Sequence, residues 1–306
     1  MADKPAAEVR IDAELVQHLV RTQAPAVRRE AAASTPVKLA EGWDCEMWRL
    51  GDHLAVRLPR RAAAAPLVLH EQRSLPLFAS AVQAAGLRLP SPVVHGSPDE
   101  RFPWPWSIVP WIEGSRGTDI PRPDRAGWSD TLAKALDALH VEAPNDHPVN
   151  PVRGSALATR ANAFTDRMRS LEAHGAMDGT TERALRDAWE AGLAAEGWRR
   201  PAVWIHGDLH PGNLVAEGSS LRGIVDFGDV TAGDPAYDLA IAWLAFDRPG
   251  RERFCRATGS RYDEATWIRA RAWAAAIAVM LLVNSDDEPD YARLGRDAAA
   301  EVASGL

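Results

Sequence analysis

The stretch HGDLHPGNLV, residues 206–215, holds the densest group of side chains that could do chemistry. His206, Asp208 and His210 alternate along it, so in an extended strand they would share one face and could begin a metal site. The other histidines are not paired with a carboxylate at a familiar ligand spacing. Neither an H-E-x-x-H motif nor a Cys/His pair occurs. A zinc hydrolase site is therefore a poor interpretation.

Asp208 has partners at a spacing that fits phosphoryl transfer. Asn213 follows it by five residues, and Asp226 follows Asn213 by thirteen, after the apolar pair Ile224-Val225. In that reaction one carboxylate accepts the proton of the attacking hydroxyl, while an amide and a second carboxylate hold Mg²⁺ against nucleotide phosphates. The Walker loop, the G-x-G-x-x-G fingerprint and the G-x-S-x-G elbow are absent from the sequence. The spacing favours a kinase-type catalytic loop.

These motifs give the chain its likeness to a known family. It resembles the aminoglycoside phosphotransferases, small-molecule kinases with a protein-kinase-like fold. The resemblance rests on HGDLHPGNLV (206–215), IVDFGD (224–229) and GDPAYDLA (233–240). It implies a bilobal α+β fold, with a small N-terminal antiparallel-sheet lobe and a larger, mainly helical C-terminal lobe. It also implies ATP or GTP with Mg²⁺ as the phosphoryl donor and a small-molecule hydroxyl as the acceptor.

The resemblance assigns roles residue by residue. Asp208 is implied to be the catalytic base, and Asn213 and Asp226 the Mg²⁺ ligands. His206 is implied to join the catalytic set as the histidine that positions the loop. Asp238 corresponds to the carboxylate that braces the same loop.

Two departures from protein kinases bear on the substrate. His-Gly-Asp stands at 206–208 in place of His-Arg-Asp, and only seven residues separate Asp226 from Asp234. That gap leaves no room for a phosphorylatable activation segment or an Ala-Pro-Glu anchor. A protein substrate is therefore not expected.

The N-terminal third offers weaker candidates for nucleotide binding. LAEGWDCEMWRL stands where the family's nucleotide-covering hairpin belongs, with Gly42 at its tip. LAVR is similar to the kinase Val-Ala-Ile-Lys strand with Arg57 in place of the lysine, and the guanidinium fork suits phosphate. Glu71, on the following helix, is the candidate ion-pair partner of Arg57. An exposed strand arginine and a solvated glutamate are the alternatives, and Lys38 is a less favoured substitute for the lysine.

VPWIEGSRG, residues 109–117, is the expected hinge between a nucleotide-binding lobe, 1–110, and a catalytic and acceptor-binding lobe, 111–306. In such folds the hinge backbone pairs with the nucleotide base, which makes Ile112 a nucleotide-binding candidate. Trp111 either flanks that base or packs the lobe junction.

The acceptor is less constrained than the reaction. The family binds polycationic aminoglycosides among carboxylates of the helical lobe. Residues 1–110 hold 13 basic and 12 acidic residues, so the net charge of −7 resides in residues 111–306, which carry −8. Asp229, Asp234 and the run Asp286-Asp287-Glu288 are candidate contacts there, or simply structural or solvated charges. An aminoglycoside is the leading acceptor; a macrolide or a metabolic alcohol such as choline or homoserine is the alternative.

Hydrophobic patterning indicates the elements that must position these residues. His140, which closes the helix LAKALDALH, is expected to be a core or capping histidine rather than a catalytic one. The expected elements are a helix over 11–21, three strands over 37–58, a helix over 67–85 with an irregularity at Pro76, short strands at LPSPVVHG and WSIVPWIEG, helices over 160–196 interrupted near 175–179, a strand at LRGIVDFGD, and helices from Asp234 onward.

Composition excludes several other classes of protein. No basic run indicates nucleic-acid binding, and Cys45 and Cys255 cannot form a disulfide framework. The N-terminus lacks the apolar core of a signal peptide, and the longest apolar run, Trp273 to Val283, is too short to span a bilayer. A cytoplasmic protein is expected. One alternative of another class is a nucleotide-binding regulator on a kinase-like fold, suggested only by the arginine in place of lysine.

Overall fold

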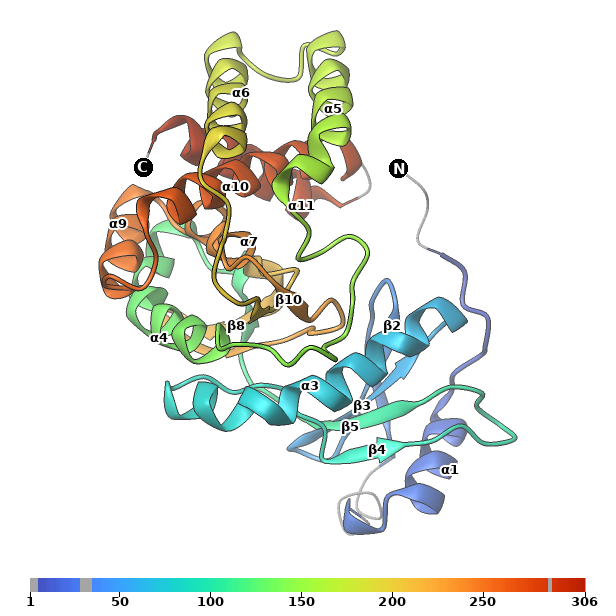
Figure 1. Cartoon of the computed structure of the whole chain (residues 1–306). Helices are drawn as coiled ribbons and strands as arrows, with labels where there is room; N and C mark the ends of the chain where they lie inside the picture. The colour runs from blue at the N-terminus through green and yellow to red at the C-terminus, as the bar shows by residue number, and fades with distance from the viewer. Residues whose placement is uncertain (1–4, 28–34, 286–287, 306) are drawn as a thin grey trace.

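The computed structural model describes residues 5–27, 35–285 and 288–305. Its N-terminal part is built on a five-stranded antiparallel sheet with the strand order β1-β2-β3-β5-β4 (Figure 1). The strands are β1 (Val37–Glu41), β2 (Cys45–Leu50), β3 (Leu54–Pro59), β4 (Val94–Gly96) and β5 (Trp106–Pro110). All five strands expected from the sequence in this part are confirmed.

Helix α1 (Ala13–Gln23) covers one face of this sheet. It begins at Asp12, whose carboxylate accepts a hydrogen bond from the Leu15 N–H. The apolar stripe of α1 shares a buried core with Val56 and Leu58 of β3. The amphipathic helix expected over 11–21 is therefore present, displaced by two residues.

Helix α3 (Ala65–Ala84) covers the opposite face. Side chains alternate along a strand, so Arg57 points away from the α1 core and toward α3. The helix runs on through Pro76, and the irregularity expected there does not interrupt it. Leu75 and Phe78, on either side of the proline, are fully buried and hold both halves against the core.

The rest of the chain is mainly helical and packs around α10, which contacts α5, α6, α7 and α11 (Figure 1). The helices are α4 (Ser129–Leu139), α5 (Ala161–Ala173), α6 (Gly179–Ala194), α7 (Ala236–Leu239), α8 (Ile241–Ala245), α9 (Arg248–Ala257), α10 (Glu264–Asn284) and α11 (Pro289–Ala303). Short 3-10 turns are η1 (Pro25–Val27), η2 (Ala62–Ala64), η3 (Gly117–Asp119), η4 (Arg122–Trp128), η5 (Leu157–Arg160) and η6 (Pro211–Asn213). The expected interruption near 175–179 separates α5 from α6.

Helix α10 is longer than the apolar run visible in the sequence. It has 21 residues and a mean hydropathy of 1.5 over its most apolar window, so by length and composition it could cross a membrane. However, 56% of that window is buried inside the protein, against the neighbouring helices. This is the placement of a core helix.

Two small sheets inside the helical part carry the loops that hold the candidate catalytic residues. β7 (Val203–Ile205) pairs with β10 (Thr231–Gly233), and β8 (Leu214–Glu217) lies between β6 (Ser115–Arg116) and β9 (Ser220–Ile224). The loop from β7 to β8 and the loop from β9 to β10 therefore run side by side.

The strand expected at LRGIVDFGD is shorter than predicted. It ends at Ile224, because Asp226 has a φ of 63°, in the left-handed region that does not fit a strand. The predicted α+β architecture, a small sheet-rich part followed by a larger helical one, is confirmed.

Candidate active site

The loop that follows β7 turns sharply at Gly207. Its φ of 83° lies in the left-handed region that favours glycine. A Cβ at this position would lie 2.4 Å from the carbonyl oxygen of Asp229. The close approach of the two loops therefore explains why His-Gly-Asp stands here: an arginine at the middle position, as in protein kinases, would not fit.

Asp238, on α7, holds the backbone of this loop. Its Oδ2 accepts a hydrogen bond from the His206 N–H (2.7 Å) and its Oδ1 accepts one from the Gly207 N–H (3.1 Å). The same Oδ2 lies 3.2 Å from His140 Nε2, whose Nδ1 is 2.7 Å from the Tyr262 hydroxyl. His140 is buried and caps α4, as expected. The contacts of Asp238 agree with a bracing role.

His206 connects the two loops and is fully buried. Its Nε2 lies 2.9 Å from the Val225 carbonyl, and its Nδ1 accepts a hydrogen bond from the Asp208 N–H (3.2 Å). These partners assign the neutral ring with its proton on Nε2. Because both ring nitrogens are occupied, His206 can position Asp208 but cannot touch a substrate.

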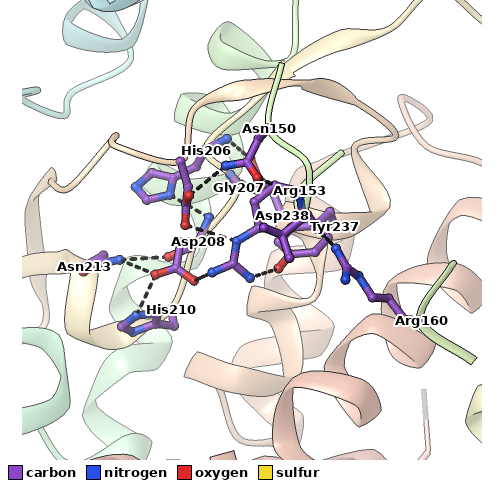
Figure 2. Close-up of polar contacts among 12 residues, drawn as sticks. Asn150, Arg153, Arg160, His206, Gly207, Asp208, His210, Asn213, Tyr237 and Asp238 are labelled. Carbon is purple, nitrogen blue, oxygen red and sulfur yellow. Dashed lines mark hydrogen bonds and ion pairs between the residues drawn. The ribbon is translucent and has the colours of Figure 1, made fainter. Parts of the chain in front are cut away.

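Asp208 projects from the loop with its side chain 35% exposed. Its Oδ1 accepts a hydrogen bond from Arg153 Nη2 (2.9 Å), and its Oδ2 lies 3.5 Å from His210 Nε2 (Figure 2). Burial raises the pKa of this carboxyl, but His210 and Arg153 outweigh that effect and hold it well below its usual range. Asp208 is therefore ionised and reachable, the state that a proton acceptor needs.

Asn213 contacts Asp208, Asp226 lies on the adjoining loop, and both side chains offer oxygen atoms. Asn213 Nδ2 donates to the Asp208 carbonyl (2.9 Å), a contact that does not use its amide oxygen. The Asn213 carbonyl accepts the Val225 N–H (2.9 Å), so Asp226 lies at the next position along. The Asp226 carboxylate is 52% exposed. Amide and carboxylate oxygens are ligands that Mg²⁺ prefers, so the pair fits a magnesium ion.

A metal site formed by protein side chains alone is a separate possibility. No group of three or more His, Cys, Asp or Glu side chains that could hold a metal ion occurs among the described residues. A magnesium ion at Asn213 and Asp226 would therefore take its remaining ligands from phosphates and water, as Mg²⁺ commonly does.

Arg57 joins the five-stranded sheet to this site. Its Nε lies 2.9 Å from Glu71 Oε2, and its Nη2 lies 2.9 Å from Asp226 Oδ1. Burial opposes the charge, but the nearby Glu71 and Asp226 keep the pKa of Arg57 well above its ordinary value. Burial raises the pKa of Glu71 to about 7, against the opposing effect of Arg57. The predicted ion pair is present and buried, so neither residue is the solvated surface charge that was the alternative.

Gly42 and Lys38 are less available than the sequence suggests. The Gly42 N–H donates to the Cys45 carbonyl (2.8 Å) and closes the turn after β1, so it is not free for a phosphate. Lys38 Nζ lies 2.7 Å from Glu41 and 2.9 Å from Glu46. The charge of Lys38 is therefore neutralised within the sheet, and of these two cations Arg57 is the one that contacts Asp226.

Trp111 and Ile112 follow β5. The Trp111 N–H donates to the His53 carbonyl (2.7 Å), and the Arg49 guanidinium lies 4.7 Å from its ring centre. Ile112 is buried and packs against Gly223 of β9. Both side chains contribute to packing around the junction of the sheets, and their contacts with a nucleotide stay a prediction.

The acidic residues considered for acceptor binding have different surroundings. Asp234 pairs with Arg269 (2.6 Å) and accepts a hydrogen bond from the Ala236 N–H at the start of α7, so its contacts are structural. Asp286 and Asp287 lie outside the described residues, and the adjacent Glu288 is exposed at the start of α11. None of these observations places a free carboxylate next to Asp208.

Arg153 is the functional candidate that sequence reasoning missed. Besides its contact with Asp208, its Nε lies 3.1 Å from Asp229 and its Nη1 donates to the Tyr237 hydroxyl (Figure 2). Asn150 fixes this loop, since it accepts the Arg153 N–H and donates to Asp229. Arg153 lies 55 residues before Asp208 and belongs to no motif. Only the fold brings these residues together.

Two cavities lie near the loops. The larger, about 350 Å³, lies behind the Asp238 brace, is lined by residues such as His140, Trp198 and Tyr262, and contains none of the proposed catalytic side chains. The smaller, about 100 Å³, is lined by Arg153 and Tyr237 and so adjoins Asp208. Of these two cavities, the smaller is therefore the one that reaches the loop of Asp208.

The site lies between a five-stranded sheet and a helical part. It combines a loop carboxylate, an adjacent amide, a second carboxylate and a buried Arg-Glu pair. This arrangement is that of a phosphotransferase of the kinase-like class. The chain belongs to the phosphotransferase enzyme family, whose model matches residues 35–274.

Solved structures support the same fold. The GDP complex of aminoglycoside 2'-phosphotransferase-IIIa has a TM-score of 0.66, covering 96% of this chain and 99% of that one, at 17% identity. A macrolide 2'-phosphotransferase from Brachybacterium faecium has a TM-score of 0.58, covering 96% of this chain and 98% of that one, at 20% identity. The bilobal, protein-kinase-like fold predicted from the sequence is confirmed.

The relatives found by sequence similarity are homoserine kinases rather than antibiotic phosphotransferases. The homoserine kinase of Methylocella silvestris is 34% identical over 203 residues, covering 59% of this chain and 57% of that protein. The homoserine kinase of Rhizobium johnstonii is 30% identical over 221 residues, covering 63% of this chain and 61% of that protein. The match thus spans about six tenths of the length of these relatives.

Proposed function

We propose that the protein transfers the γ-phosphoryl group of ATP or GTP, with Mg²⁺, to a hydroxyl group of a small molecule. The observation that carries this proposal is the meeting of an ionised, reachable Asp208 with Asn213 and Asp226 on adjoining loops. The GDP complex of a solved relative supports a nucleotide donor.

Each of these residues has a distinct task in the proposed reaction. Asp208 accepts the proton of the acceptor hydroxyl as its oxygen attacks. Asn213 and Asp226 would hold Mg²⁺, which, when bound, neutralises negative charge on the phosphates. His206 and Asp238 keep Asp208 in place through the loop backbone.

We propose that Arg57 binds the phosphates of the nucleotide. Glu71 pairs with the Nε of Arg57. The Nη2 group, which contacts Asp226, is the part of the guanidinium that can also bind a phosphate. The alternative of a nucleotide-binding regulator rested on the missing lysine. It has less support because Arg57 makes a buried ion pair with a glutamate of α3.

For the acceptor, we propose a metabolic alcohol of the homoserine type ahead of an aminoglycoside or a macrolide. The relatives at 30–34% identity are homoserine kinases, whereas the aminoglycoside and macrolide enzymes share only the fold at 15–20%. Asp229 and Asp234, which could receive a polycation, are already paired with Arg153 and Arg269. A nucleotide donor and two cysteines without a disulfide support a location in the cytoplasm.

The test is acceptor-stimulated nucleotide consumption by the wild-type protein. ATP and GTP with Mg²⁺ are offered with panels of metabolic alcohols, aminoglycosides and macrolides, and the phosphorylated product is identified by mass. We expect one panel to stimulate turnover and a chelator to abolish it. Nucleotide at 100 times its Kd should also stabilise the fold by about 2.7 kcal/mol. Absence of both effects with every acceptor would contradict the proposal.

A further inference from the structure

A groove between α5 and α10 opens beside Arg153 and Tyr237. Its two walls are single helix faces, because the lining residues recur at spacings of three and four. The first wall is formed by Arg160, Ala163, Phe164 and Arg167, and the second by Trp273, Ala276, Ile277 and Met280. The Tyr237 and Trp273 rings pack edge to face at the inner end of the groove (4.7 Å). The groove is thus an extension of the site at Asp208.

The charge of this groove is positive. Arg153, Arg160 and Arg167 line it, and none of the lining residues in the described part of the chain is acidic. Burial and the charge of Arg160 lower the pKa of Arg167. Two partly buried cations therefore lie on the same wall of the groove, where their charges repel each other.

The three arginines are not equivalent. Arg153 contacts Asp208 and Asp229, so its charge is already neutralised. The Arg160 guanidinium donates to the Val152 carbonyl, and in the described ranges no carboxylate lies within ion-pair distance of Arg160 or Arg167. These two guanidinium groups are the ones left to bind an anion.

We propose that the groove binds the acceptor through an anionic group, a carboxylate or a phosphate, held by Arg160 and Arg167. The rest of the acceptor lies along the apolar wall, and its hydroxyl end reaches Asp208 past Arg153. This inference rests on the proposed function and names its substrate class: a small hydroxylated molecule that carries an anionic group. A polycation would be repelled here. A cavity of about 100 Å³ is also small for a drug-sized ligand, which usually occupies about 300–1,000 Å³.

The experiment compares acceptors that differ only in charge. One set is homoserine, its carboxamide and its diol; a second is para-hydroxymethyl benzoate with the matching benzamide and benzylamine. The monophosphate of butanediol separates phosphate from carboxylate as the preferred anion. We expect the KM of the best anionic acceptor to be at least ~10-fold below that of its neutral analogue, as loss of a hydrogen bond to a charged group predicts.

The arginines are tested by the double variant R160Q/R167Q. It should raise the KM of the anionic acceptor to that of the neutral analogue, while kcat and the nucleotide KM stay unchanged. The matched control is R169Q, an arginine on the exposed side of α5 that pairs with Asp166. Relief of repulsion should leave the Tm of the double variant unchanged or higher, whereas a structural role would lower it.

The outcomes separate this inference from the proposed function. If the best acceptor is a polycation, or if R160Q/R167Q keeps the preference for the anion, the enzyme stands and the groove assignment is overturned. If no acceptor of any charge stimulates nucleotide consumption, the proposed function itself fails and this inference fails with it.

Discussion

The catalytic loop and the α5–α10 groove lie on either side of Arg153 and are built in different ways. In the loop, contacts are short in sequence: Asn213 bonds the carbonyl of Asp208 five residues earlier, and His206 bonds the Asp208 N–H. In the groove, residues of α5 and α10 meet across more than a hundred positions of the chain. The one carboxylate of the loop, Asp208, has ion-pair partners in Arg153 and His210. The groove carries two arginines without ion-pair partners among the described residues.

This difference indicates where each property of the protein resides. Hydrogen bonds to neighbouring backbone groups fix the proposed catalytic side chains, so a short motif suffices to predict the reaction. The proposed acceptor site depends on how two helices pack, and helix packing leaves no short signature in the sequence. Under the proposed function, a local motif therefore specifies the reaction, and the tertiary structure specifies the choice of acceptor. The variants below perturb one region while sparing the other.

The largest effect is expected for Asp226→Asn. The substitution removes a charge from the proposed Mg²⁺ site while keeping the shape of the side chain. Several kcal/mol of charge stabilisation correspond to about a 10³-fold loss of kcat. Turnover against Mg²⁺ concentration measures it. Unchanged turnover at every Mg²⁺ concentration would remove Asp226 from the site.

Gly207→Ala should come next, because it breaks the loop geometry. A φ of 83° costs an alanine about 1–2 kcal/mol, and overlap with the Asp229 carbonyl adds about 1–3 kcal/mol. Gly175→Ala is the matched control, since Gly175 has a φ of 59° with nothing near its Cβ position. Urea unfolding should show a larger loss for Gly207→Ala, together with low activity. Equal losses of unfolding free energy in the two variants would show that the contact with the Asp229 carbonyl does not affect stability.

Arg153→Gln removes the side chain that separates the two regions. It leaves the carboxylates of Asp208 and Asp229 without their shared cation, at a cost of about 1–3 kcal/mol in unfolding free energy. The pKa of Asp208 is depressed in the fold, so this stabilisation is present above its unfolded pKa and is lost as the pH falls. Wild type and variant should therefore differ in stability at pH 7 and converge in acid. A difference in unfolding free energy that stays constant with pH would contradict this expectation.

The smallest effect is expected for Glu71→Gln, and it appears in the pH dependence. Burial raises the pKa of Glu71 from 4.5 to about 7, so its ion pair with Arg57 is complete only above that pH. Wild-type kcat/KM for nucleotide should rise about 3- to 10-fold between pH 6 and 8 as the carboxylate ionises. The variant should lack this step.

Ionisation of Glu71 is expected to raise kcat/KM but to lower folding stability. Between pH 4.5 and about 7 the unfolded chain releases the Glu71 proton while the folded protein keeps it. Folding stability therefore falls as the pH rises through that range. The pKa of Asp208 is too low to produce either change. A pH step that persists in Glu71→Gln would assign it to another residue.

Much of the catalytic region was predictable, because its signals are local. The spacing of Asp208, Asn213 and Asp226 placed three side chains that the structure brings together, and strand alternation brought Arg57 to Glu71. The strand at LRGIVDFGD was drawn too long, since the left-handed backbone of Asp226 is not visible in a hydrophobic pattern.

The acceptor region was not predictable from the sequence, for a physical reason. Arg153 follows Asn150-Pro-Val in an ordinary loop, and its importance arises only where that loop crosses the catalytic one. Asp234 is acidic and close to a motif, yet its partner is Arg269 on α10. Net charge alone suggested an acidic acceptor site, whereas the groove beside Asp208 is basic.

The most direct test of the central claim is single-turnover phosphorylation of the best acceptor by Asp208→Asn, with Asp166→Asn as an exposed control. Asparagine keeps the shape of Asp208 but cannot accept the hydroxyl proton. We expect phosphoryl transfer to slow by about 10²–10⁴-fold, with nucleotide binding and Tm retained, while the control behaves as wild type. Wild-type transfer by Asp208→Asn would contradict the assignment of Asp208 as the base.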